Sequence, residues 1–120
     1  MLAIKVLDHI LITIPANTRE LAREFYVKKL LLEEIPGQHP NGAIWLKLGN
    51  IELHIREEDN HQSDSSRHPA FVVENLDDAK SFLKNIIIPV SFSSLIDGRD
   101  RCFFRDPWGN RFELIEFDPK

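Results

Sequence analysis

The sequence predicts an α+β domain in which two tandem βαβββ modules form a curled mixed β-sheet with helices on its outer face. Two observations support this fold. The order of strand-type and helix-type segments in the first half of the chain recurs in the second half, at about 55 residues per module. The hairpins that close the two halves carry similar stretches, GNIEL and GNRFEL. We therefore expect a single domain over residues 1–120, with module one at about 1–56, a linker at about 57–67 and module two at about 68–120.

Module one contains the segments of a strand, a helix and a hairpin. Residues 3–15 are rich in β-branched side chains and end at a proline, which predicts a strand. Apolar residues then recur at helical spacing and predict a long helix over about residues 17–31, with an Asn-Thr pair available to cap it. Residues 43–57 form two apolar runs around a Gly49–Asn50 turn and predict a pair of strands.

Module two repeats this order. Residues 68–75 predict a strand, and residues 76–85 predict a shorter helix with an apolar stripe. Residues 88–96 predict one strand or two short pieces, and residues 101–117 predict the closing hairpin. Its turn, DPWG at residues 106–109, has proline at the second position and glycine at the fourth, as a type I turn prefers. The two modules together predict roughly eight strands.

Composition narrows the class of protein. A formal net charge of -4 argues against a nucleic-acid surface, because phosphate binding requires a basic patch. The single cysteine, Cys102, rules out an internal disulfide, fits a reducing compartment and predicts a small buried strand residue. No apolar run approaches the ~20 residues that span a bilayer, and the first residues lack a signal-peptide core. We expect a soluble cytoplasmic domain with no nucleic-acid or membrane partner.

Five polar residues are predicted to lie on the sheet face opposite the helices, namely His9, Glu52, His54, His68 and Glu113. Curling of a duplicated sheet would bring these side chains into one concavity. Imidazole and carboxylate groups are ligands of Zn²⁺, Mn²⁺, Fe²⁺, Co²⁺ and Ni²⁺, so the pattern predicts one divalent metal ion. The repeat aligns Glu113 with Glu52 by local sequence and with His54 by strict count, and both alignments remain open.

Glu113 lies in a segment that is otherwise built from Phe, Leu and Ile side chains. A lone buried carboxylate is strongly destabilising unless it is neutralised or paired. A divalent cation would supply the compensating charge. We therefore expect Glu113 to be a metal ligand, with a salt bridge to Arg101 or Arg105 as the other explanation.

Several stretches of the chain resemble a known superfamily. The opening D-H-[IV] and the closing D-P-x-G-N-x-x-E-L patterns are fairly specific to it. On these residues the chain resembles the vicinal oxygen chelate superfamily, also called the glyoxalase/bleomycin-resistance/dioxygenase superfamily. The resemblance implies paired βαβββ modules, a divalent metal held on the open face of the sheet, and homodimers. The matching stretches span almost the whole chain, and they are LDHILITIP, AREFYVKKLLLEEIP, WLKLGNIELHI, HPAFVVENLDDAKSFL and FFRDPWGNRFELIEF.

Residue by residue, the resemblance implies metal ligands at His9, His68 and Glu113. In the glyoxalase I-like pattern a glutamate at the end of module one is the fourth ligand, which implies Glu52. His54 stands two residues further on and is a rival for that place. His54 is therefore kept as a candidate ligand, and Glu52 and Glu113 are the candidate catalytic bases. No substrate-binding residue is assigned.

The resemblance implies a glyoxalase-family metal-dependent enzyme that acts on a small oxygenated substrate. The reaction would be of lyase, isomerase or dioxygenase type, with the metal stabilising an oxyanion as a Lewis acid. The alternative is a non-catalytic protein of the bleomycin-resistance type, which binds and sequesters a small molecule. Trp45, Trp108 and the Phe103–Phe104 pair are candidates for an apolar pocket in either case. His39 and His61 are expected to be solvated and are given no role.

Overall fold

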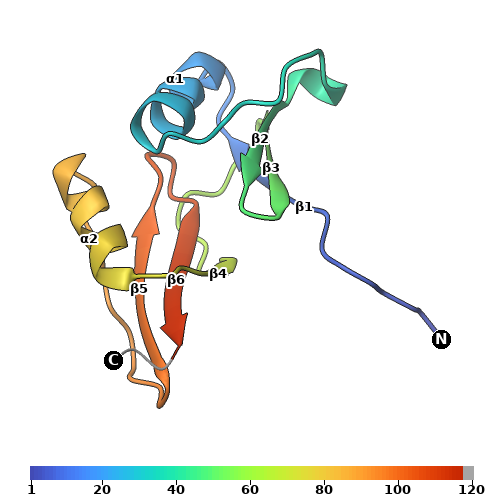
Figure 1. Cartoon of the computed structure of the whole chain (residues 1–120). Coiled ribbons are helices and arrows are strands. Elements are labelled where there is room, and N and C mark those ends of the chain that lie inside the picture. The colour runs from blue at the N-terminus through green and yellow to red at the C-terminus, as the bar shows by residue number, and fades with distance from the viewer. Residues whose placement is uncertain (118–120) are drawn as a thin grey trace. The chain divides into compact units, whose positions relative to one another are not determined.

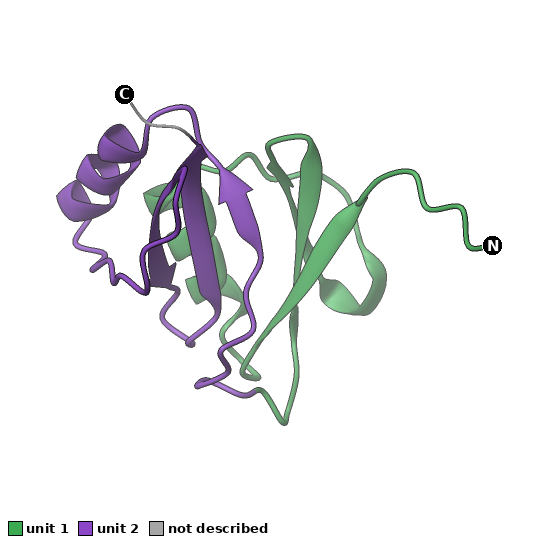
Figure 2. Cartoon of the chain, turned by 90° about the horizontal axis from the view of Figure 1, so that it is seen from below, with its two compact units in different colours: residues 1–61 green, residues 62–120 purple. Residues whose placement is uncertain are grey.

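The computed structural model describes residues 1–117 (Figure 1). The chain divides into two compact units, residues 1–61 and residues 62–120, which Figure 2 shows in green and purple. The division falls inside the predicted linker of residues 57–67. Each unit contains a mixed three-stranded sheet and a helical segment. The predicted α+β class with a duplicated module is therefore confirmed.

The sheet of unit 1 contains β1 (His9–Ile14), β2 (Ile44–Leu48) and β3 (Ile51–Glu57), in the order β1-β3-β2. β1 runs parallel to β3, whereas β2 runs antiparallel to it, as the crossover and the hairpin connections require. A short 3₁₀ turn, η2 (Pro40–Gly42), precedes β2. Three successive residues in the middle of β3 are buried, so both faces of this central strand are covered.

The first strand is shorter than the sequence predicts. A strand was expected from residue 3, but residues 1–8 are exposed and lie outside β1. His9 already pairs with Glu52, and β3 begins one residue earlier, directly after the Gly49–Asn50 turn. The earliest residues of the chain thus extend beyond the end of the partner strand, where no ladder of hydrogen bonds can form with β3.

The helix of unit 1 lies within the predicted range of 17–31. It is shorter than predicted, and its second half has the wider turn of a π-helix. α1 (Arg19–Arg23) continues directly into η1 (Glu24–Lys29), a segment with the wider turn of a π-helix. Asn17 and Leu31 have φ values of 66° and 63°, in the left-handed region. The backbone therefore leaves the right-handed helix at both of these residues.

The sheet of unit 2 repeats the arrangement of unit 1. It contains β4 (Ala70–Val72), β5 (Arg99–Arg105) and β6 (Arg111–Phe117), in the order β4-β6-β5. β4 is parallel to β6 and β5 is antiparallel to it. The helix predicted over residues 76–85 is confirmed as α2 (Leu76–Asn85).

Polar groups tie the first turn of α2 to β6. Asn75 Oδ1 accepts a hydrogen bond from the Asp78 N–H at 2.9 Å, as an N-cap side chain does. Glu116 Oε1 accepts a hydrogen bond from the Leu76 N–H at 2.8 Å. The face of β6 that carries Glu116 is therefore turned toward α2. Strand alternation then places Glu113 on the opposite face, as the sequence predicts.

Residues 1–117 form six strands rather than the predicted eight. In each module the missing strand is reduced to an isolated bridge, at Glu34 in unit 1 and at Ser91 in unit 2. A proline stands two residues from each bridge, Pro36 in the first case and Pro89 in the second. Because proline has no N–H to donate, the bridge does not extend into a ladder past it.

The turn of the DPWGN stretch is held by its own polar groups. Asp106 Oδ1 accepts hydrogen bonds from the N–H groups of Trp108 at 2.9 Å and Asn110 at 2.8 Å. Gly109 has a φ of 87°, and a Cβ at this position would lie 1.8 Å from the backbone oxygen of Ser63. Only glycine allows the chain to pack so closely on the turn. Asp106 and Gly109 are therefore explained by the structure of the turn.

Two predictions from composition can be compared with the fold. Cys102 is fully buried in β5, as expected for a small strand residue. Burial raises the pKa of its thiol, because a thiolate at this position would lose its hydration. Within residues 1–117, none of the helices has the length and apolar character needed to cross a bilayer.

Candidate functional site

The backbone of the two sheets makes Glu113 the counterpart of Glu52. In unit 1 the Glu52 N–H donates to the Asp8 carbonyl at 3.1 Å, and in unit 2 the Glu113 N–H donates to the Pro69 carbonyl at 3.0 Å. Both glutamates therefore enter a parallel ladder at the same point of a central strand. Of the two alignments that the sequence leaves open, the one that places Glu113 on Glu52 agrees with the register, and the one on His54 does not.

The two histidines that open the modules do not occupy equivalent backbone positions. His9 is the ladder partner of Glu52, whereas the ladder partner of Glu113 is Ala70. His68 lies two residues before Ala70. Relative to the glutamate of its own unit, His68 therefore lies two residues earlier than His9 does. His68 nevertheless reaches the glutamate of its own unit, with Nε2 2.9 Å from Glu113 Oε1.

His9 forms a hydrogen bond through Nδ1, and its other ring nitrogen, Nε2, takes no part in that bond. Its Nδ1 lies 2.8 Å from Asp8 Oδ2. Because a carboxylate can only accept, Nδ1 is the donor in this hydrogen bond, and in the neutral tautomer with this donor Nε2 carries the lone pair. The His9 side chain is 44% exposed. An imidazole held through one nitrogen by a carboxylate is the usual arrangement of a metal-ligating histidine.

His9 is also the outer ring of a four-ring stack in unit 1. His39 lies on Trp45 with 4.2 Å between ring centroids, Trp45 lies on His54 at 4.1 Å, and His54 lies on His9 at 4.0 Å. The ring planes in these pairs are inclined by 12°, 2° and 17°. Trp45 and His54 are direct cross-strand partners of β2 and β3, which places their rings against each other.

Sequence reasoning missed this stack and the groups that anchor it. His39 and His61, which were expected to be solvated, are partly exposed, and each also has a hydrogen-bond partner. His39 Nε2 donates to the Ile35 carbonyl at 2.9 Å, and His61 Nδ1 lies 2.7 Å from Thr13 Oγ1. The pair of Trp45 and His54 could have been predicted, because the two residues face each other across the predicted hairpin.

Glu52 and His54 form a hydrogen-bonded pair on one face of β3. His54 Nε2 donates to Glu52 Oε1 at 2.9 Å, since the carboxylate can only accept. His54 is buried, whereas the Glu52 side chain is 38% exposed. The carboxylate is thus held at one oxygen while part of it stays accessible.

Glu113 is buried and contacts two partners within unit 2. His68 Nε2 lies 2.9 Å from Oε1, and Arg101 Nη1 lies 3.3 Å from Oε2. Of the two arginines considered from sequence, Arg101 therefore forms the salt bridge. Arg105 instead donates to backbone carbonyls of the turn and the linker. The guanidinium compensates the charge of Glu113, so its burial alone does not require a metal ion.

Each ring nitrogen of His68 faces an oxygen acceptor. Nδ1 lies 2.9 Å from the Ser66 carbonyl, and Nε2 lies 2.9 Å from Glu113 Oε1. A neutral ring carries one proton and satisfies one of these contacts. With the proton on Nδ1, the Nε2 lone pair points toward the carboxylate. A second proton or a metal cation between the two atoms satisfies both.

A second guanidinium lies beside this pair. Arg111 Cζ is 3.9 Å from the centroid of the Phe103 ring, and Arg111 Nη1 is 3.5 Å from His68 Nδ1. No ion pair with Arg111 is found in the part of the chain that the structure describes. Arg101 Nε is buried and meets no acceptor there either. The surroundings of Glu113 therefore carry more positive than negative charge.

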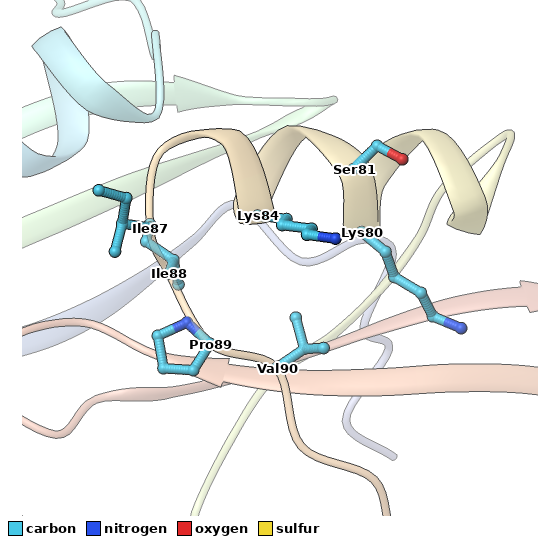
Figure 3. Close-up of a pocket in the computed structure, with 7 residues that line it drawn as sticks. All are labelled: Lys80, Ser81, Lys84, Ile87, Ile88, Pro89 and Val90. Carbon is cyan, nitrogen blue, oxygen red and sulfur yellow. The ribbon is translucent and has the colours of Figure 1, made fainter.

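A pocket of about 570 Å³ in unit 2 lies away from these side chains. Figure 3 shows its lining, which comes from one side of α2 and from the segment after it, residues 87–90. The walls are apolar except for the side chains of Lys80, Ser81 and Lys84. None of the predicted site residues lines this pocket, so it is not part of the candidate site.

The predicted ligands fall into two groups, with His9, Glu52 and His54 in unit 1 and His68 and Glu113 in unit 2. Among residues 1–117, no three His, Cys, Asp or Glu side chains are arranged so that they could hold a metal ion. Convergence of the two groups on one ion therefore stays a prediction.

Comparisons with known proteins address the family. No family model and no curated protein matches the chain. A solved structure of a glyoxalase family protein from Bacillus anthracis is 35% identical to this chain, with a TM-score of 0.86, over 96% of this chain and 97% of that one. Two more distant structures share the fold. Lactoylglutathione lyase from Agrobacterium tumefaciens is 19% identical, with a TM-score of 0.74 over 95% of each chain. TnmS3, an antibiotic binding protein from Streptomyces sp. CB03234, is 17% identical, with a TM-score of 0.73 over 96% of this chain and 99% of that one.

The identity and coverage of the first of these structures, together with the shared fold, complete the assignment that the D-H-I and D-P-x-G-N-x-x-E-L stretches suggested. The chain belongs to the glyoxalase family of the vicinal oxygen chelate superfamily.

Proposed function

We propose that this protein is a metal-dependent enzyme acting on a small oxygenated molecule. His9, Glu52, His68 and Glu113 would be the ligands of one divalent ion, Zn²⁺, Mn²⁺, Fe²⁺, Co²⁺ or Ni²⁺. The observation that carries the proposal is common to the two histidines. Each has its Nδ1 against an oxygen acceptor, a carboxylate in one case and a backbone carbonyl in the other. Such contacts orient an imidazole so that Nε2 can bind a metal.

The spacing within unit 2 suits two neighbouring ligands. Donor atoms at about 2.0–2.2 Å from an ion and at right angles to each other are about 2.8–3.1 Å apart. His68 Nε2 and Glu113 Oε1 are 2.9 Å apart. Arg101 holds the other carboxylate oxygen, so Oε1 is directed toward the imidazole. These two residues require little movement to accept an ion.

When bound, the metal would polarise a substrate oxygen as a Lewis acid and stabilise the negative charge that develops on it. Proton transfer is left to the carboxylates of this chain. To act as the general base, a ligating carboxylate would have to leave the metal. Glu52 is the better candidate, because its side chain is 38% exposed, whereas that of Glu113 is 6% exposed and is held by Arg101. A base that removes and returns a proton beside a carbonyl group supports a lyase or isomerase reaction more directly than a dioxygenase reaction.

The charge around Glu113 supports a substrate that carries or develops negative charge. Arg111 lies over Phe103 and beside His68 without a carboxylate partner in the described part of the chain. A guanidinium in that position can accept a carboxylate or an oxyanion in a bidentate manner.

A binding protein without catalysis is the second candidate. TnmS3 is described as an antibiotic binding protein, and it shares this fold. The exposed outer face of the His9 ring, at the end of the stack, offers a flat ligand an aromatic surface. This candidate does not require a metal, so metal content separates it from the first.

Elemental analysis of protein purified without chelator or affinity metal tests the proposal. We expect close to one divalent ion per chain. Calorimetric titration of Zn²⁺ into metal-free protein should then show binding that His9→Ala and His68→Ala weaken by at least ~10-fold. His61→Gln is the matched control, because His61 is no proposed ligand, and it should leave the affinity unchanged. A protein that binds none of the five ions would overturn the enzyme proposal and favour sequestration.

We also propose that the protein is a cytoplasmic homodimer. The free thiol of Cys102 suits a reducing compartment. The strand order leaves β1 as an edge strand, and residues 2–7, which precede it, expose Leu, Ile and Val side chains. A second copy could cover these groups through a two-fold interface. Sedimentation at micromolar concentration should give twice the mass of one chain, and a monomer would contradict the proposal.

A further inference from the structure

His54 lies between the two predicted ligands of unit 1, His9 and Glu52, and contacts both. We propose that His54 is a positioning residue rather than a metal ligand. It holds the Glu52 carboxylate through a hydrogen bond and the His9 ring through stacking. This role rests on the proposed metal site, and part of its test is independent of metal.

Nε2 of His54 already takes part in a hydrogen bond with Glu52. Nε2 donates to Glu52 Oε1 at 2.9 Å, and both faces of the ring are covered, by Trp45 at 4.1 Å and by His9 at 4.0 Å. A metal at Nε2 would have to displace that hydrogen bond inside a residue that is only 8% exposed. His9 has the opposite character, because its engaged nitrogen is Nδ1 and its side chain is 44% exposed.

The stacking geometry excludes a site shared by His9 and His54. An imidazole binds a metal through a lone pair that lies in the plane of the ring, so the ion lies in that plane. The two rings are stacked face to face, with centroids 4.0 Å apart and planes inclined by 17°. One ion cannot lie in two planes that are nearly parallel and separated in this way. If His9 binds the metal, Glu52 is therefore the remaining candidate of the two for the fourth ligand.

The stack is anchored at both ends, which lets His54 act as a fixed support. At one end His9 Nδ1 is held by Asp8 Oδ2 at 2.8 Å. At the other end His39 covers the outer face of Trp45 and donates through Nε2 to the Ile35 carbonyl at 2.9 Å. Rings locked by packing and hydrogen bonds hold the groups attached to them within a narrow range of positions.

Nuclear magnetic resonance of the histidine ring protons tests the stack without any metal. Trp45 should shift the ring protons of His54 upfield, because they lie over the face of the indole. Trp45→Leu should remove this shift, and Trp45→Phe, which keeps an aromatic face, should retain part of it. His61, outside the stack, serves as the internal reference. Unshifted His54 protons in the wild-type protein would overturn the proposal whatever the metal experiments show.

Titration with Co²⁺, followed by visible absorption, tests the positioning role. Wild-type protein that binds none of Zn²⁺, Mn²⁺, Fe²⁺, Co²⁺ and Ni²⁺ refutes the proposed function, while the ring-proton shifts still report on the stack. Given binding, His54→Phe keeps an aromatic ring but loses the N–H donor, and it should weaken Co²⁺ binding by about 10- to 100-fold, as losses of groups behind a ligand do. His54→Gln restores a donor N–H at the place of Nε2 and should recover the part of that affinity that depends on the hydrogen bond to Glu52.

The absorption spectrum separates a positioning residue from a ligand. The cobalt bands of His54→Gln should match those of wild type, because the set of ligand atoms is unchanged. Glu52→Gln removes a ligand and should alter both the bands and the affinity. If His54→Gln changes the bands and loses as much affinity as Glu52→Gln, then His54 binds the metal and the proposal is wrong. Thermal unfolding of each variant checks that the fold is retained.

Discussion

The two units hold equivalent glutamates with different side chains. Glu52 and Glu113 occupy the same point of a central strand, and each has an imidazole nitrogen at 2.9 Å. In unit 1 the imidazole belongs to the same strand and is supported by stacked rings. In unit 2 it comes from 45 residues away, and the Arg101 guanidinium joins it. The side chains of the glutamates are 38% and 6% exposed. A partly hydrated carboxylate can be held by a hydrogen bond from an imidazole, whereas a buried one requires opposite charge.

The largest difference between the units should come from the glycines of their closing turns. A Cβ on Gly109 would lie 1.8 Å from the Ser63 backbone oxygen, whereas a Cβ on Gly49 would meet nothing within 4 Å. Both residues have positive φ, at 87° and 58°. We expect Gly109→Ala to lower the free energy of unfolding by at least about 4 kcal/mol, or to prevent folding. Gly49→Ala should lower it by about 1 kcal/mol, from backbone strain alone. Denaturant unfolding measures both, and equal losses would mean that residue 63 does not pack on the turn.

Removal of the charge that compensates Glu113 should have the next largest effect. Arg101→Met at neutral pH leaves a buried carboxylate with His68 as its remaining partner. We expect a loss of about 3 kcal/mol in the free energy of unfolding, as for other broken buried ion pairs. Adding Glu113→Gln should restore much of this loss, because the unpaired charge is then gone. Lys28→Met removes an exposed ion pair with Glu24 and is the control, which should unfold like wild type. If Arg101→Met also unfolds like wild type, then the buried Glu113 does not require the charge of Arg101, and charge does not explain the difference between the two glutamates.

Metal affinity provides a direct comparison of the two glutamates. Glu113→Gln and Glu52→Gln each keep the shape of the side chain and remove its charge. Each should weaken Zn²⁺ binding by at least ~10-fold in calorimetry, since both are proposed ligands. The metal-free fold should stay intact in Glu52→Gln, whose carboxylate is partly exposed. A Glu113→Gln protein with wild-type affinity would leave the Arg101 salt bridge as the explanation of this carboxylate.

The smallest predicted effect concerns Cys102, which has no counterpart in unit 1. Burial raises the pKa of the thiol in the folded protein above that of the unfolded chain. The neutral thiol therefore favours the folded state fully below the unfolded pKa of about 8.5, and this contribution is lost as pH rises above that value. Denaturant unfolding between neutral and alkaline pH should show a steeper loss for wild type than for Cys102→Ala. The same pH dependence in both proteins would show that the thiol does not contribute.

Much of the fold follows from local patterns in the sequence. The helix over residues 76–85 was predicted with the right ends, because Asn75 supplies a cap and the apolar stripe has a helical period. The strand from residue 3 was predicted too long, because β-branched residues favour an extended chain whether or not a partner strand lies beside them. In each unit, the strand expected between the helix and the closing hairpin is only an isolated bridge. Strand propensity is a property of a single segment, whereas strand pairing requires two.

The sequence by itself determined the duplication, the α+β class, the superfamily motifs and the five ligand-type residues, because each of these is written in residue types and spacings along the chain. Only the tertiary structure decided that Glu113 corresponds to Glu52, that Arg101 pairs with Glu113, and that His54 is held between two rings. These outcomes depend on strand register, in which a shift of one residue turns a side chain to the other face. They also depend on contacts between residues far apart in the chain, which no local pattern of polarity can specify.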